Sequence, residues 1–158
     1  MKRRSATGRE KVVSWISYCF ILLFLYAAMS KLMDYQEFKV QLSQSPILMD
    51  YAAVLVWLVP VVEIVIAIML AFKKTMLPGM FAAFGLMAMF SVYILMILYS
   101  GERIPCSCGG LLEKMSWQQH LVFNIVFVVL GIVGIVLQSV ISREAKRREI
   151  SPIRSRRP

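Results

Sequence analysis

The chain has 158 residues, of which 59% are hydrophobic, and its formal net charge is +9. Soluble domains carry about 45–50% apolar residues, so this composition argues against a soluble globular fold. The charge does not indicate nucleic-acid binding, because the basic residues gather beside apolar runs and lack interleaved aromatic side chains for base stacking. We therefore expect a lipid bilayer, and no nucleic acid, as a partner of this chain.

Four apolar runs are each long enough to cross a bilayer, which takes about 20 residues per helix. They cover residues 12–32, 51–72, 76–99 and 117–141. The first run is too long for the apolar part of a cleaved signal peptide, so we expect it to remain as a helix. Short connections make neighbouring helices antiparallel. The predicted fold class is all-α: a polytopic membrane protein with an antiparallel bundle of four transmembrane helices.

The polar segment 33–50 lies between the first two runs. Within it Tyr35, Phe38 and Leu42 recur at helical spacing. This pattern predicts a short amphipathic helix that lies at the membrane interface after the first span. Pro46 is expected to end that helix.

The later spans contain signals for close helix packing and for one helix start. Ser116 and Gln119 form an S-x-x-Q capping box before the fourth run. Small residues let helices approach closely in membranes. They occur in the third run as Gly79, Ala83 and Gly85, and in the fourth as Gly131 and Gly134.

The distribution of lysine and arginine predicts the orientation. Residues 1–11 and 142–158 are basic, and Lys73-Lys74 closes the second run. Cytoplasmic segments of membrane proteins carry an excess of such residues. We therefore expect a cytoplasmic N-terminus over 1–11, a transmembrane domain over 12–141, and a disordered cytoplasmic tail over 142–158. The loop before the fourth run then faces the periplasm, with the protein in a bacterial inner membrane.

That loop contains the chain's most reactive side chains, Cys106 and Cys108, followed by Gly109-Gly110. Cysteines in an oxidising compartment tend to be paired or redox-active. An i, i+2 disulfide would be strained, and strained, exposed disulfides are the labile or catalytic ones. The pair also lies before a helix N-terminus, which favours thiolate. We interpret Cys106 and Cys108 as a catalytic dithiol pair.

Two other interpretations of the cysteine pair stay open. A static disulfide would hold the loop, although so short a ring stabilises little by chain entropy. Alternatively, soft thiolates would bind Cu(I). A zinc site is short of ligands, because one histidine accompanies the pair. No resident metal is therefore predicted.

His120 and Asn124 follow the pair on one face of the fourth helix. His120 can exchange a proton with a thiol, so we place it with the two cysteines in the catalytic group. Asn124 would orient the histidine or donate a hydrogen bond to a carbonyl-bearing cofactor such as a quinone. The alternatives are an interfacial role for His120 and helix–helix contact for Asn124.

Three further residues in the spans need an interpretation. Glu63 lies within the second run, where an ionisable residue is a functional candidate by default. It would relay protons for a quinone, or bond to a backbone carbonyl freed by Pro60. Lys31 is expected to snorkel from the end of the first helix, and Cys19 to be a small core residue.

The sequence resembles the MauE branch of the DoxX-like membrane proteins over residues 12–141. The resemblance rests on Ser30-Lys31-Leu32, on Pro60 with Glu63, on the loop Pro105-Cys106-Ser107-Cys108-Gly109-Gly110, and on the start of the fourth helix. It implies an inner-membrane protein of methylamine utilisation that helps a disulfide-rich periplasmic dehydrogenase subunit mature beside a thioredoxin-like partner. By the same resemblance, Cys106 and Cys108 would be the redox pair.

The predicted function is thus membrane thiol–disulfide exchange with a periplasmic thioredoxin-like partner, with a quinone as a candidate cofactor. A non-catalytic assembly subunit and a Cu(I)-handling protein are the alternative functions.

Overall fold

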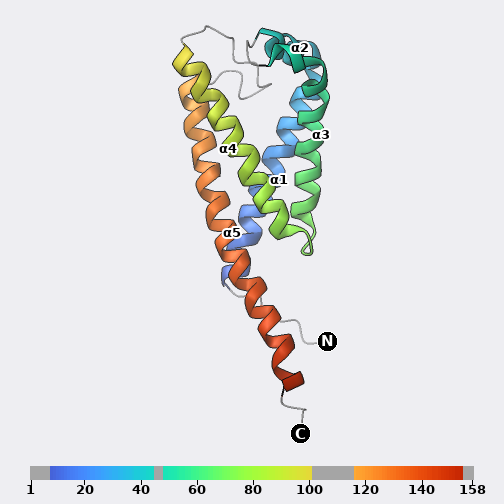
Figure 1. Cartoon of the computed structure of the whole chain (residues 1–158), viewed down its shortest axis with the longest axis vertical. Helices are drawn as coiled ribbons and strands as arrows, with labels where there is room; N and C mark the ends of the chain where they lie inside the picture. The colour runs from blue at the N-terminus through green and yellow to red at the C-terminus, as the bar shows by residue number, and fades with distance from the viewer. Residues whose placement is uncertain (1–7, 45–47, 101–115, 155–158) are drawn as a thin grey trace.

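A computed structural model describes residues 8–44, 48–100 and 116–154 (Figure 1). The described chain is helical throughout its regular structure. Four long helices are apolar enough to cross a membrane, and a short helix lies between the first two of them. In chain order the elements are α1 (Gly8–Met33), α2 (Tyr35–Gln44), the 3₁₀ turn η1 (Met49–Tyr51), α3 (Ala52–Ala71), α4 (Met76–Ser100) and α5 (Trp117–Arg154).

The four long helices form an antiparallel bundle, as the sequence predicts (Figure 1). Helix α1 packs mainly on α3 and α5, and α4 packs on the same two helices. The helices therefore follow one another around the bundle in the order α1, α3, α4, α5. Large apolar side chains on the outer faces, such as Leu22, Val54 and Val122, are exposed. This is the arrangement that a lipid environment requires of a multi-pass membrane protein.

The predicted amphipathic helix is confirmed as α2, which lies across one end of the bundle (Figure 1). Its apolar residues Phe38 and Leu42 are buried against Ala52 and Val56 at the start of α3. The exposed face carries polar side chains such as Glu37 and Lys39. We call this end of the molecule the α2 end.

The opposite end of the bundle collects basic residues, and we call it the basic end. It holds the start of α1, the turn with Lys73 and Lys74, and the far part of α5 (Figure 1). Arg9 on α1 pairs with Glu144 on α5 at 3.0 Å. Although a disordered tail is expected from residue 142, α5 continues as a helix to Arg154, because the sequence there is rich in helix-forming Glu, Lys and Arg.

Several small residues permit close helix contacts, as expected. A Cβ atom on Gly134 would lie 3.0 Å from Sδ of Met80, and one on Gly131 would lie 3.3 Å from Cβ of Phe84. These contacts bring α4 and α5 together. Gly85 does not make the close helix contact that the sequence predicts, because a Cβ atom there would meet nothing within 4 Å.

The two halves of the bundle are packed differently. The main core lies toward the basic end, where Val13, Ile16, Leu70 and Met80 pack against one another. Phe20 and Phe24 continue this core along α1, and the Phe20 ring meets Phe127 of α5 edge-on at 5.3 Å. Toward the α2 end the helices enclose a cavity instead, which has room for a ligand.

Candidate functional site in the α2-end cavity

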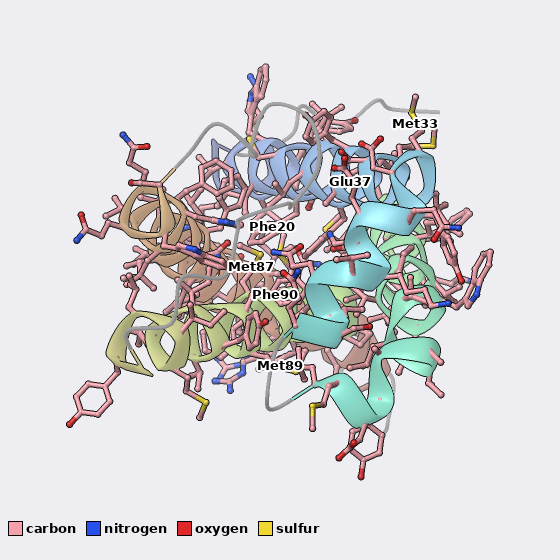
Figure 2. The ribbon with its side chains drawn as sticks, turned by 90° about the horizontal axis from the view of Figure 1, so that it is seen from above. Phe20, Met33, Glu37, Met87, Met89 and Phe90 are labelled. Carbon is pink, nitrogen blue, oxygen red and sulfur yellow. The ribbon has the colours of Figure 1, made fainter. Side chains whose placement is uncertain are left out.

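The cavity at the α2 end has a volume of about 220 Å³ and is lined by all five helices. Its walls are mainly apolar and aromatic, with a few polar groups. Seen along the bundle, Phe20, Met87 and Phe90 occupy the interior between the helices, and α2 runs beside them across the same end (Figure 2). The lining residues used below are Lys31, Phe38, Gln41, Glu63, Met89, Phe90, Tyr93, Trp117, His120 and Asn124.

An ion pair forms one wall of the cavity. Nζ of Lys31 on α1 donates to Oε1 of Glu63 on α3 at 2.7 Å, and also to the backbone oxygen of Ala27 at 3.4 Å. Glu63 is 0% exposed and Lys31 is 8% exposed. The lysine ammonium lies 5.8 Å from the ring centre of Phe38 and 5.9 Å from that of Phe90. The two aromatic rings add cation–π stabilisation to the buried cation.

The expectation that Lys31 snorkels is wrong, and helix geometry explains why. Cα–Cβ bonds tilt toward the N-terminus of a helix, which in α1 is the direction into the bundle. The side chain therefore points down to Ala27 and Glu63 while α2 covers it. The expected bond from Glu63 to a backbone carbonyl freed by Pro60 is also wrong, because the carboxylate accepts from Lys31 instead.

His120 and Asn124 reach the cavity from the start of α5. The predicted capping box is confirmed: the Gln119 N–H donates to Oγ of Ser116 at 3.3 Å, and the Ser116 N–H donates to Oε1 of Gln119 at 3.0 Å. These bonds fix the first turn of α5, where His120 is 8% exposed. One turn deeper, Asn124 is 3% exposed, and within residues 8–44, 48–100 and 116–154 its Nδ2 donor has no hydrogen-bond acceptor.

The structure thus brings three of the predicted site residues together: Glu63, His120 and Asn124 line one cavity. Cys106 and Cys108 lie outside the described residues. Cys19 is exposed on the surface of α1, so its predicted place in the core is wrong. Within the described parts of the chain, no group of three or more His, Cys, Asp or Glu residues could hold a metal ion.

Sequence reasoning missed Gln41, Phe90 and Tyr93, which also line the cavity. Gln41 is a buried polar residue on the apolar face of α2, but nothing in its spacing separates it from a surface glutamine. The ion pair did leave a signal. Lys31 and Glu63 have opposite charges and belong to consecutive spans, and ionisable residues within a bilayer tend to pair.

A four-helix bundle with a covered, mainly apolar cavity that holds a few polar groups defines a multi-pass membrane protein with an internal site. The comparison with known families is more specific: this chain belongs to the MauE family, whose model, described as methylamine utilisation protein MauE, matches residues 9–137. No solved structure matches the chain.

One curated relative is the methylamine utilization protein MauE of Paracoccus denitrificans. It is 34% identical over an alignment 113 residues long, and the alignment covers 68% of this chain and 61% of the relative. The match therefore spans less than two thirds of that relative's length.

Proposed function

We propose that this chain is a thiol–disulfide redox protein of the bacterial inner membrane, in which Cys106 and Cys108 exchange electrons with a thioredoxin-like partner. The observation that carries the proposal is the position of His120. It is the chain's only histidine, and it lies in the capped first turn of α5, soon after the cysteines in sequence and at the cavity. A histidine there would take up the proton that a reacting thiol releases.

The chemical step is dithiol–disulfide exchange, which needs no further oxidant. One thiolate of the pair attacks a disulfide of the partner, forming a mixed disulfide and releasing one partner thiolate. The second cysteine then attacks the mixed disulfide. The products are a Cys106–Cys108 disulfide and the reduced partner, which has gained two electrons. The reverse sequence returns the electrons.

The orientation supports exchange on the periplasmic side. Basic residues collect at the end of the bundle opposite the cavity, and basic segments stay in the cytoplasm. Helix α4 ends and helix α5 begins at the α2 end (Figure 1), and Cys106 and Cys108 lie between these two helices in sequence. We infer cytoplasmic termini and a periplasmic cysteine loop.

The biological setting that we propose is methylamine utilisation, because the family and the Paracoccus relative carry that name. In this role the chain would support maturation of a disulfide-containing periplasmic dehydrogenase subunit.

The test is a trapping experiment with Cys108→Ser in a Cys19→Ser background, which leaves Cys106 as the only thiol. We expect a mixed disulfide between Cys106 and an envelope protein, seen on non-reducing gels and absent when Cys106 is also changed to Ser. A membrane-impermeant maleimide should label Cys106 in intact cells. Protection of Cys106 in intact cells, with labelling after lysis, would overturn the orientation.

The same experiment separates the alternative functions. A wild-type pair that never changes redox state when reductant is added, together with no trapped adduct, would show a static clip and defeat the redox proposal. Copper that copurifies with the wild type and is lost in Cys108→Ser would favour Cu(I) handling instead.

A further inference from the structure

Two polar side-chain atoms at the cavity are buried and have no hydrogen-bond partner among the described residues. They are Oε2 of Glu63, an acceptor, and Nδ2 of Asn124, a donor. Glu63 is 0% exposed and Asn124 is 3% exposed, and both side chains line the cavity. Buried polar groups are almost always paired, so unpaired ones need an explanation. A ligand with both an oxygen acceptor and a hydroxyl donor would satisfy them.

The walls of the cavity restrict the ligand further. The charges of Lys31 and Glu63 offset each other, so the site does not favour an ionic headgroup such as a phosphate, which would face the Glu63 carboxylate. The rings of Phe38, Phe90 and Trp117 provide flat apolar surfaces. A volume of about 220 Å³ exceeds the roughly 150 Å³ of an engineered apolar cavity that holds benzene. A neutral, substituted six-membered ring would therefore fit.

A second hollow, an apolar groove on the lipid-facing side, lies next to the cavity. It lies between α3 and α4, has a volume of about 440 Å³ and is lined by apolar residues that include Val65, Met69 and Gly85. Met89 lines both the cavity and the groove. Figure 2 shows Met89 farther from the bundle centre than Phe90, and its side chain is 56% exposed. A ring in the cavity could thus carry a tail that runs out past Met89.

We propose that the cavity binds the headgroup of an isoprenoid quinone and that the groove between α3 and α4 holds its tail. A quinone carbonyl accepts a hydrogen bond from Nδ2 of Asn124, and a quinol hydroxyl donates to Oε2 of Glu63. The quinol therefore satisfies both unpaired atoms, whereas the quinone satisfies the Asn124 donor alone. The lipid-soluble tail explains how such a ligand reaches a site inside the membrane part of the bundle.

The test measures quinone binding to the full chain in nanodiscs of defined phospholipid. The probes are a tail-less dimethoxy-methylbenzoquinone and the same ring with an isoprenoid tail. Bound quinone is extracted, quantified, and corrected for empty nanodiscs. We expect saturable binding of both probes, and tighter binding of the tailed one.

Two variants separate the headgroup site from the groove. Asn124→Leu removes one hydrogen bond and keeps the number of side-chain non-hydrogen atoms, so it should weaken the binding of both probes about three- to tenfold. Gly85→Leu fills the groove at a position where a Cβ meets nothing within 4 Å. It should therefore weaken the binding of the tailed probe only. The groove assignment fails if Gly85→Leu changes the affinity for both probes equally, or changes the affinity for neither.

The quinone site does not depend on the cysteines. A Cys106→Ser, Cys108→Ser double variant should bind both probes as the wild type does, so failure of the redox proposal and failure of this one give different results. Retention no greater than in empty nanodiscs would overturn the site. Unchanged quinone binding by the Asn124→Leu variant would also overturn the site. So would a protein that copurifies with phospholipid alone and with no quinone.

Discussion

Nζ of Lys31 on α1 lies 2.7 Å from Oε1 of Glu63 on α3, with both side chains buried in the membrane part of the bundle. A lone charge at such a depth is costly, on the order of 3 kcal/mol or more. The pair offsets this cost because the two charges neutralise each other, and it joins two adjacent helices beside the cavity. The ion pair therefore holds α1 against α3 and also compensates two buried charges.

Lys31→Met should destabilise the bundle, because it leaves the Glu63 carboxylate buried without its cation. Removing one partner of a buried ion pair costs about 3–5 kcal/mol. We expect a marked fall in the temperature at which the detergent-solubilised protein loses its folded peak in size-exclusion chromatography.

The matched control for this prediction is the double variant Lys31→Met, Glu63→Leu. Well-packed apolar replacements of a buried pair are often neutral, so the double variant should recover most of the lost stability. A single variant as stable as the wild type would show that the pair contributes little. A double variant no better than the single one would point to lost packing of the lysine stem against Phe38 and Phe90.

Asn124→Leu should raise the stability of the empty protein. The Nδ2 donor of Asn124 is buried without an acceptor in the part of the chain that the structure describes, and an unsatisfied buried group costs about 1–3 kcal/mol. Leucine has the same branching and number of side-chain non-hydrogen atoms, and it needs no hydrogen-bond acceptor. We expect the unfolding temperature of quinone-free protein to rise by several degrees, in the same assay. A fall in that temperature would mean that Asn124 stabilises the bundle, and would count against its assignment as a ligand-facing residue.

The span positions, the antiparallel order, α2 and the capping box at Ser116 were all predictable, because each depends on residues close together in sequence. Length and hydropathy define the spans, and the spacing of Phe38 and Leu42 defines the buried face of α2. The partnership of Lys31 with Glu63 depends instead on which helices are neighbours in the ring, and a single sequence does not state that order.

The cavity could be predicted only in part, for a similar reason. Glu63, His120 and Asn124 were selected for their chemistry, and each is unusual within an apolar span. The walls at Phe90 and Tyr93 consist of residues that are ordinary in a membrane helix, so their role follows only from where packing leaves space. Cys19 shows the converse error: cysteine is often buried, yet its position on α1 faces outward.

Ser116→Ala should loosen the first turn of α5, since it removes the acceptor for the Gln119 N–H. Loss of an N-cap costs about 1 kcal/mol. Hydrogen exchange should become faster at the backbone amides of residues 117–120, the turn that carries His120. Ser116→Asp should retain slow exchange, because aspartate caps as well as serine. Equal exchange rates in the alanine variant and the wild type would show that the cap does not hold this turn.

Gly79→Ala should destabilise the contact between the start of α4 and the end of α3. A Cβ atom there would lie 3.1 Å from Cβ of Met69 and 3.2 Å from the backbone N of Leu70. A backbone atom cannot rotate away as a side chain can, so α4 must shift, and such overpacking costs about 1–3 kcal/mol.

Gly85→Ala is the matched control on the same helix: its added Cβ meets nothing within 4 Å, and alanine favours helix by about 1 kcal/mol. The thermal unfolding temperature should therefore fall for Gly79→Ala and should stay the same or rise for Gly85→Ala. Equal shifts in both would mean that glycine flexibility, and not close packing, determines the choice of residue at position 79.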